Sequence, residues 1–512
     1  MGIRQGTLVK IVPIFCLIVP SLRAEVVLPS VFGDHMVLQQ GTTLPIWGKA
    51  SAGETVRVRI AGRRGETVAN ESGDWRVTLR PLPKSSTPLT LLVEGSNHLE
   101  IHDVLVGDVW LCAGEGNMAF PVSRSSTGGG SADSIAESGI RFFLADHVAT
   151  KTIPQHPLGS GHWIRCTAET LPDLPAVSYF FARDVASSQH LPVGIISCTR
   201  EGAPLSSWIS SRGIGMIGEA ASSPNPSARD VEKSPPAGSS GASAEGNSPG
   251  EFPPSSVFNG MISPLIPYAL TGFIWYQGES DEGVGALQYR RLFPQLVRDW
   301  RGHWGEGPVP FYFVSLAGFG DRDDRNVESY HDSHGRMLPG WPWIREGTAC
   351  ALTLPNTGMA VVSDLGDDME KCPSDKLNVG RRLALLARHR VYGEEVVDQG
   401  PAYKSMKVEG DKLRITFDSI GGGLVLGMPP SLADDAVPVL SAKLRGFFIS
   451  GDSRKWYPAH ARIEGADVVL WSDGVEKPIA ARYGWNGFPT GNLYNREGLP
   501  AAPFRTDSSQ PD

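Results

Sequence analysis

The sequence has 512 residues, a length that predicts two or three domains instead of one core. Its 41% hydrophobic and 20% charged residues are typical of a globular protein. The formal net charge of -8 is mild, so it gives no electrostatic reason to expect nucleic acid or an anionic membrane surface as a partner. A neutral or weakly polar ligand fits this charge better.

The first 24 residues have the features of a secretory signal peptide. Arg4 and Lys10 precede or open an apolar run over residues 11–20, and Ala24 ends a short segment suited to cleavage. The run is too short to span a bilayer, and no later stretch is long and apolar enough for a membrane helix. We therefore expect a secreted or periplasmic protein without a membrane span. The alternative interpretation of the run is a buried first strand.

Six cysteines are present, and Cys16 lies in the expected signal peptide. The five that remain are an odd number, so at least one of them is free or paired with another chain. The count is too low for a fold that depends on disulfides.

Residues 25–104 alternate apolar and polar side chains, as the strands of a small β-sandwich do. Val56, Val58 and Ile60 alternate with arginines, and a second alternating run follows a turn signal at 72–74. A similar pattern returns from residue 400, with a hairpin expected at Gly410 and further strands at 447–449, 461–463 and 468–471. We therefore expect β-sandwich modules over residues 25–104 and 400–512.

Between residues 105 and 399, short apolar runs alternate with helical patterns, which predicts an α/β domain with a parallel sheet. Expected helices include 289–301 and 377–388, and the expected strands are 109–112, 142–145, 194–197, 272–276, 311–316 and 359–362. No dinucleotide-binding or P-loop glycine pattern follows a strand, so we expect no cofactor. Residues 219–256 are rich in Ser, Pro, Gly and Ala and predict a flexible surface insertion.

The stretch 108–118 predicts a buried strand that ends in a glycine-containing turn, an edge suited to a nucleophile. It resembles the first motif of SGNH (GDSL-type) hydrolases in the form used by the sialate O-acetylesterase family, Gly-Gln-Ser-Asn-Met. Residues 258–268, 274–280, 354–359 and 378–384 are also similar to that family. The resemblance implies a flavodoxin-like SGNH core with a parallel sheet, flanked by N-terminal and C-terminal β-sandwich modules, and no metal.

The resemblance assigns catalytic roles to positions that are substituted in this sequence. Gly116 stands at the position of the serine nucleophile, and Cys372 stands at the position of the histidine base. Glu370 stands at the acid position, with Asp367 or Asp368 as alternatives. A glycine has no side chain with which to attack an ester.

The same resemblance places two oxyanion donors. Gly202 matches a glycine whose backbone N–H faces the oxyanion, although Glu201 replaces a second glycine beside it. Asp281 replaces an asparagine, and an ionised carboxylate there would repel an oxyanion. The residues expected to bind substrate are Glu115, Asn117, Gln277 and Glu279.

Loss of triad members that work as one unit reduces turnover on the order of a million-fold. We therefore predict a catalytically impaired or inactive homologue that retains a pocket for a small-molecule or glycan ligand such as an O-acetylated sugar. The alternative is an active carbohydrate O-acetylesterase with a non-standard catalytic set.

Three such sets are open. Cys372 could be the nucleophile, although no histidine lies beside it in sequence. Ser280 or Ser206 could supply the hydroxyl, with His331 or His334 as the base. A metal could be bound without a recognisable spacing signature by Glu115, Asp281, Glu370 and Cys372.

Overall fold

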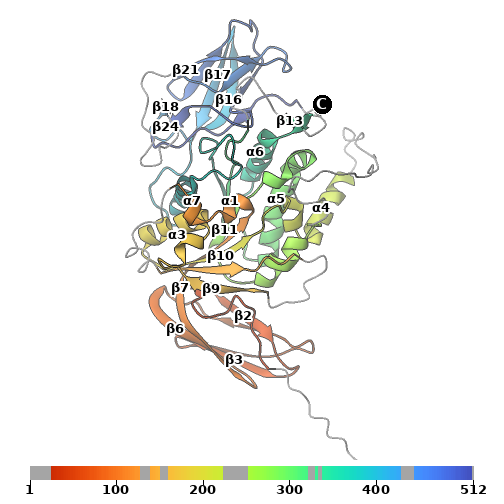
Figure 1. Cartoon of the computed structure of the whole chain (residues 1–512), viewed down its shortest axis with the longest axis vertical. Helices are drawn as coiled ribbons and strands as arrows, with labels where there is room; N and C mark the ends of the chain where they lie inside the picture. Colours follow the sequence, from red (N-terminus) through yellow and green to blue (C-terminus); the bar gives the residue numbers. More distant parts are fainter. Residues whose placement is uncertain are drawn as a thin grey trace, which may run out of the picture.

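The computed structural model describes residues 25–126, 139–149, 159–222, 252–320, 329–331, 337–427 and 443–509. The molecule is elongated, with an N-terminal β region, a central α/β region and a C-terminal β region along its long axis (Figure 1). The expected signal peptide lies outside the described residues, as do residues 223–251 of the expected insertion. Among the described helices, none combines the length and the apolar character needed to cross a membrane.

One mixed sheet organises the central region. Its parallel strands have the order β15-β12-β11-β7-β10-β8, and β9 adds an antiparallel edge. All six expected strands are present, but β12 and β15 each end two residues before the expected end, because buried residues continue past the last paired ones. The bounds are His98–Gly114 (β7), Ile140–Ala145 (β8), Gly161–Arg165 (β9), Val193–Thr199 (β10), Gly272–Tyr276 (β11), Phe311–Val314 (β12) and Thr357–Ala360 (β15).

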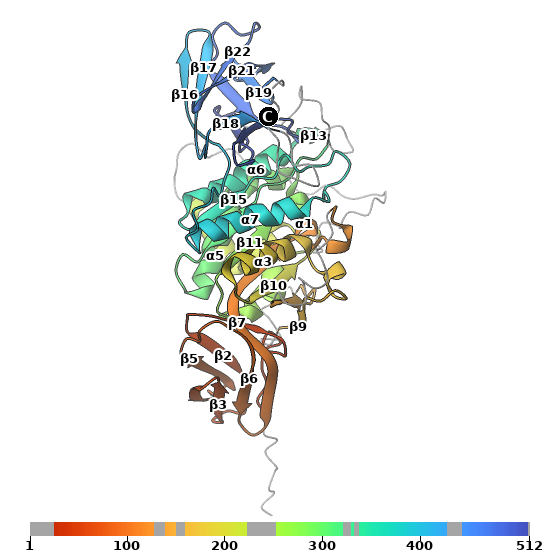
Figure 2. The ribbon, with the colours of Figure 1, turned by 90° about the vertical axis from the view of Figure 1, so that its left-hand side faces the viewer.

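Helices cover both faces of this sheet, with α3 and α7 on one face and α4 and α5 on the other (Figures 1 and 2). The two expected helices lie inside α5 and α7. Helix α3 was missed because residues 176–182 are all buried, so the segment has no polar face to give a helical period. The bounds are Gly116–Ala119 (α1), Ala176–Gln189 (α3), Ser211–Ser222 (α4), Val284–Trp304 (α5), Trp341–Ala349 (α6) and Lys376–Arg390 (α7).

Strand β7 is continuous across residues 104 and 105, where the sequence predicted a domain boundary. Its first half pairs with β6, and its second half pairs with β10 and β11. The N-terminal β region therefore shares one apolar core with the central region. Its other strands are Val37–Gln39 (β1), Leu44–Lys49 (β2), Thr55–Ile60 (β3), Arg63–Val68 (β4), Asp74–Leu79 (β5) and Ser85–Glu94 (β6).

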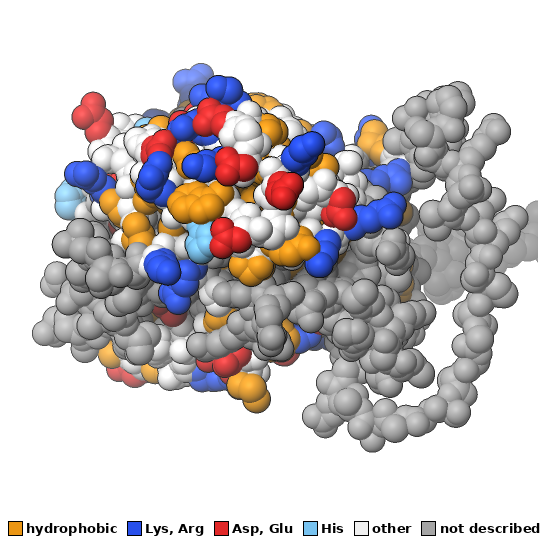
Figure 3. All heavy atoms as spheres, turned by 90° about the horizontal axis from the view of Figure 1, so that it is seen from above, with side chains coloured by type: hydrophobic (Ala, Val, Ile, Leu, Met, Phe, Trp, Pro, Cys, Tyr) orange, Lys and Arg blue, Asp and Glu red, His pale blue; other side chains and the backbone are white. Residues whose placement is uncertain are grey.

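The C-terminal β region has an apolar core of its own. The expected hairpin is confirmed, since β16 pairs with β17 across a turn at Gly410. Acidic and basic side chains are interspersed on this end of the molecule (Figure 3). The strands are Ala402–Glu409 (β16), Lys412–Asp418 (β17), Leu424–Leu426 (β18), Phe447–Ser450 (β19), Tyr457–Pro458 (β20), His460–Glu464 (β21), Asp467–Trp471 (β22), Ala480–Tyr483 (β23), Leu493–Asn495 (β24) and Phe504–Arg505 (β25).

A buried arginine on α6 joins the C-terminal region to the sheet. The guanidinium of Arg345 donates to the carbonyls of Leu316 and Ala317, which follow β12, each at 2.8 Å. It also donates to the carbonyls of Asn486 and Gly487 in the C-terminal region, each at 2.7 Å. Burial lowers the pKa of Arg345 to about 9. One side chain thus supplies hydrogen bonds to four carbonyls from two regions of the chain.

The expected insertion and residues 320–342 both contain ordered elements. Helix α4 extends into the expected insertion. At the C-terminal end of the insertion, Phe252 is buried and the N–H of Ser255 donates to the carbonyl of Ser206 at 3.0 Å. Within residues 320–342, Ser329–His331 (β13) pairs with Met337–Pro339 (β14). All five cysteines in the described part of the chain are free.

Candidate functional site

The residues singled out by the sequence gather at the carboxyl ends of β7, β10 and β11. Gly114 ends β7 with φ +148°, and a Cβ there would lie 1.9 Å from the carbonyl oxygen of Tyr276 at the end of β11. Only glycine allows this close approach of the two strands. The chain then turns through Glu115 into the short helix α1. Ligands of parallel α/β sheets commonly bind at this edge.

Glu115 fastens the loop that follows β11. Its carboxylate accepts hydrogen bonds from the N–H of Gly278 at 2.9 Å and from the N–H of Ser280 at 3.0 Å. It also accepts the hydroxyl of Ser280. Glu115 is buried, so these three bonds compensate the loss of water around its oxygens. Ser280 is therefore committed to Glu115 and is not placed as a free nucleophile.

Asn117 connects three segments below this turn. Its amide nitrogen donates to Glu279 and, at 3.0 Å, to the carbonyl of Lys371, while its amide oxygen accepts from Lys376. Asn117 and Lys376 are fully buried. We call the set Glu115, Asn117, Glu279 and Lys376 the site floor.

Burial sets the protonation of the floor. It raises the pKa of Glu279 well above the usual value, and the nearby Glu115 raises it further. Burial also lowers the pKa of Lys376 to about 8, against the attraction of Cys372 and Glu279. The ammonium of Lys376 lies 4.7 Å from the ring centroid of Phe120, a cation–π contact that partly replaces water.

Gly116 and Cys372 lie side by side next to the site floor. An ideal Cβ on Gly116 would lie 3.1 Å from the sulfur of Cys372 and 4.0 Å from Oε1 of Glu201. Cys372 is half-buried, and burial followed by the charge of Glu279 raises its pKa to about 12. The side chain is therefore a neutral thiol at physiological pH, which argues against its use as a thiolate nucleophile. We call Gly116, Glu201 and Cys372 the substituted edge.

Gly202 follows Glu201 in the loop after β10. It has φ +73°, a left-handed conformation that favours glycine. The N–H of Arg200 donates to the carbonyl of Gly114 at 2.8 Å, which holds this loop against the end of β7. Glu201 is exposed.

Asp281 is directed into the protein instead of toward Gly116. Its Oδ2 accepts from the N–H of Leu205 at 2.9 Å and from the amide of Gln277 at 2.6 Å. Gln277 is held in turn by the hydroxyl of Tyr289 at 2.9 Å. Burial raises the pKa of Asp281 to about 7, and the two hydrogen bonds oppose that rise. These contacts join the loops after β10 and β11.

Among the described residues, no hydrogen bond joins Glu370 to Cys372. Glu370 is exposed, and its N–H donates to the carboxylate of Asp367 at 3.2 Å. The carboxylates whose charges raise the pKa of Cys372 belong to Glu279, Glu115 and Glu201.

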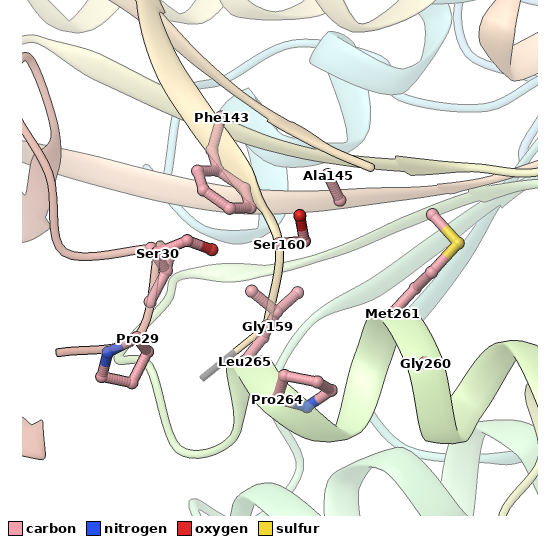
Figure 4. A pocket seen from close by; sticks show the side chains of 11 residues that line it. Pro29, Ser30, Phe143, Ala145, Gly159, Ser160, Gly260, Met261, Pro264 and Leu265 are labelled. Atoms are coloured by element: carbon pink, nitrogen blue, oxygen red, sulfur yellow. The ribbon is translucent and has the colours of Figure 1, made fainter. Parts of the chain in front are cut away.

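Of the other catalytic sets, His331 lies in β13 and His334 lies outside the described residues. The described chain holds no group of three or more His, Cys, Asp or Glu side chains suited to a metal, so the metal alternative gains no support. A separate cavity between the N-terminal region and the sheet shares no residue with the floor or the edge and has no charged side chain (Figure 4). Its lining includes Ser30, Phe143, Ser160 and Met261.

Sequence reasoning gave Lys376 no role. A signal was present, because Lys376 begins α7 directly after its N-cap Asp375, and a cation is disfavoured at the positive end of a helix. Such a placement indicates a lysine held by specific partners. Here the partner is Asn117.

No family model matches the chain. Sialate O-acetylesterases from Mus musculus and Homo sapiens are 27% and 28% identical to it, with 93% of this chain covered in each case and 93% and 91% of the relatives covered. A solved structure of a carbohydrate acetylesterase from Xanthomonas citri is 32% identical, and the match covers 94% of this chain and 100% of that chain with a TM-score of 0.79.

Proposed function

The chain belongs to the sialate O-acetylesterase family, and on that premise we propose that it is a secreted, catalytically impaired member that still binds an O-acetylated sugar or a related glycan ligand. The observation that carries this proposal is the pair of Gly116 and Cys372, because a Cβ built on Gly116 would lie 3.1 Å from the sulfur of Cys372. Side chains at these two positions would touch, and a nucleophile and its base must likewise be neighbours.

The chemistry of this pair supports the proposed impairment. A serine esterase needs a hydroxyl that attacks the acetyl carbonyl and an imidazole that removes its proton. Gly116 has no hydroxyl, and the neutral thiol of Cys372 cannot accept a proton near neutral pH. The pair therefore cannot form an acyl-enzyme.

The remaining assignments follow from the contacts. We assign Gly202 as a backbone donor beside Gly116, because its loop is held to the end of β7. Asp281 is better described as a positioning residue, since its carboxylate is used by Leu205 and Gln277. Four residues that we expected to contact the ligand are buried, namely Glu115, Asn117, Gln277 and Glu279. Their main role in the proposed ligand site is to hold its loops in place.

Two further parts of the proposal concern the rest of the chain. We propose that residues 1–24 are a cleaved signal peptide, on the strength of their sequence pattern. We also propose that the two β regions are sandwich modules that flank the SGNH-like core, supported by their antiparallel sheets.

An active esterase with a non-standard catalytic set is the second candidate. The observation that favours it is the carboxylate of Glu201, which lies beside the empty position on Gly116. This candidate predicts rapid, saturable hydrolysis of acetyl esters.

Turnover of an aryl acetate by the mature protein separates the two candidates. We expect a rate on the order of a million-fold below that of a family member with an intact triad, and no labelling by a serine-directed fluorophosphonate. Calorimetric titration with O-acetylated and de-O-acetylated sialic acid and with an acetylated neutral sugar tests binding. Rapid turnover would refute the impairment, and failure to bind any of these sugars would refute the retained glycan site.

A further inference from the structure

A carboxylate occupies the surroundings of the missing nucleophile. Glu201 follows β10, and its Oε1 lies 4.0 Å from the place where a Cβ of Gly116 would be. The sulfur of Cys372 lies 3.1 Å from the same place. Because Gly116 has no side chain, no side-chain atom of residue 116 fills the space beside this thiol and this carboxylate. Glu201 is exposed, so water reaches it from outside.

We propose that Glu201 activates a water molecule in the space beside Gly116, and that the residual ester hydrolysis of this chain proceeds by direct attack of that water without an acyl-enzyme. The inference rests on the proposed function, because it identifies the slow chemistry that an impaired site retains. It makes Glu201 a catalytic residue for acetyl esters.

The geometry meets the requirement for a general base. Such a base must lie within about 2.6–3.2 Å of the oxygen whose proton it removes. A water oxygen about 2.8 Å from Oε1 of Glu201, on the side of Gly116, falls in the volume that a serine side chain at position 116 would occupy. The glycine at 116 and the glutamate at 201 are thus complementary changes: one removes the nucleophile, and the other supplies a base for its substitute.

The neighbouring groups leave this role to Glu201. Three carboxylates act on Cys372, namely Glu279, Glu115 and Glu201. Glu115 already accepts hydrogen bonds from the 278–280 loop, and Glu279 is buried and bonded to Asn117. Of the three, only Glu201 is exposed.

The reaction balances with water as the second reactant. The water oxygen bonds to the acetyl carbonyl carbon while its proton passes to the carboxylate of Glu201, which gives a tetrahedral oxyanion. The ester C–O bond then breaks, and the departing sugar oxygen takes the proton back from Glu201. Acetic acid and the free sugar hydroxyl are released. Within the described residues, the N–H groups of Gly116 and Gly202 have no hydrogen-bond acceptor, so both are available to the oxyanion.

Aryl-acetate turnover in the presence of fluorophosphonate tests the proposal. Glu201→Gln keeps the size of the side chain but removes the base, and we expect turnover to fall by about 100-fold or more. Glu476→Gln, an exposed carboxylate in the C-terminal region, is the matched control and keeps the wild-type rate. In Glu201→Gly, added formate should restore part of the rate, an effect that a merely structural glutamate would not show.

The outcomes separate this inference from the proposed function. Slow, inhibitor-resistant turnover that is unchanged in Glu201→Gln would overturn the inference alone, as would wild-type turnover no faster than that of denatured protein. A rate that fluorophosphonate abolishes would overturn both, because it would reveal a working serine nucleophile. Thermal unfolding of each variant, with midpoints equal to the wild-type value, establishes that the comparison is between folded proteins.

Discussion

The site floor and the substituted edge lie in contact but differ in how their side chains are held. Glu115, Asn117 and Lys376 are buried, and each supplies hydrogen bonds to another segment. Gly116 contributes no side chain, and Glu201 is exposed. Removing one floor residue leaves a buried polar partner unsatisfied, which costs about 1–3 kcal/mol, whereas changing an edge residue has no such cost. The stability of the fold therefore constrains the floor residues, whereas the edge residues can change without strongly destabilising the protein.

The largest effect should come from restoring the edge on the unchanged floor. Gly116 does not have a left-handed φ, so a serine backbone is allowed there. In Gly116→Ser with Cys372→His, hydroxyl and imidazole are both present, and we expect fluorophosphonate-sensitive turnover at least about 1,000-fold above either single variant. Aryl-acetate kinetics on the three variants measure this.

Gly116→Ala with Cys372→His is the matched control, because it has the same crowding without the hydroxyl. Equal inactivity of the serine and alanine double variants, both folded, would show that the floor no longer supports an esterase edge. The claim that only the edge has lost its chemistry would then be wrong.

The next effect concerns pH and Asp281, which links the floor to the loop after β10. Its pKa is raised from 3.8 to about 7, so the folded state binds this proton more tightly than the unfolded state. Its contribution to stability is therefore full below about pH 4 and is lost as pH rises to about 7, on the order of 4 kcal/mol in all.

Asp281→Asn removes this dependence because an amide does not titrate between pH 4 and pH 8. Its amide oxygen can still accept from Leu205 and Gln277, so both hydrogen bonds are kept. Urea unfolding between pH 4 and pH 8 should show the variant gaining stability relative to the wild type as pH rises. Asp411→Asn, in the exposed hairpin turn, should show no such trend. A parallel pH dependence in wild type and Asp281→Asn would contradict the assigned protonation.

The smallest of the three effects separates floor from edge directly. Asn117→Ala leaves the buried Lys376 and the carbonyl of Lys371 without their partner, so we expect the free energy of unfolding to fall by about 3 kcal/mol. Cys372→Ala removes a half-buried thiol and should cost about 1 kcal/mol or less. Urea unfolding at pH 7 measures both. Equal losses would show that the edge is as much a part of the folding core as the floor.

The predicted strands were found because each is a short, mostly apolar run, as at Gly272–Tyr276. Helix α5 was found for its apolar face. Helix α3 gave no such signal, and the boundary at residue 104 failed to mark a break because β7 serves two regions with one continuous strand. Local periodicity indicates which face of an element is buried, but it does not indicate which other elements that face packs against.

The sequence by itself determined that position 116 has no hydroxyl and position 372 no imidazole, because these are properties of residue type. Only the tertiary structure decided that a Cβ on Gly116 would lie 3.1 Å from the sulfur of Cys372, and that the carboxylate of Glu201 lies beside it. It also decided that Asp281 accepts from Leu205. The physical reason is that these residues lie on loops from different strands and helices. Their distances depend on how the sheet and its helices pack, which no local pattern in the chain contains.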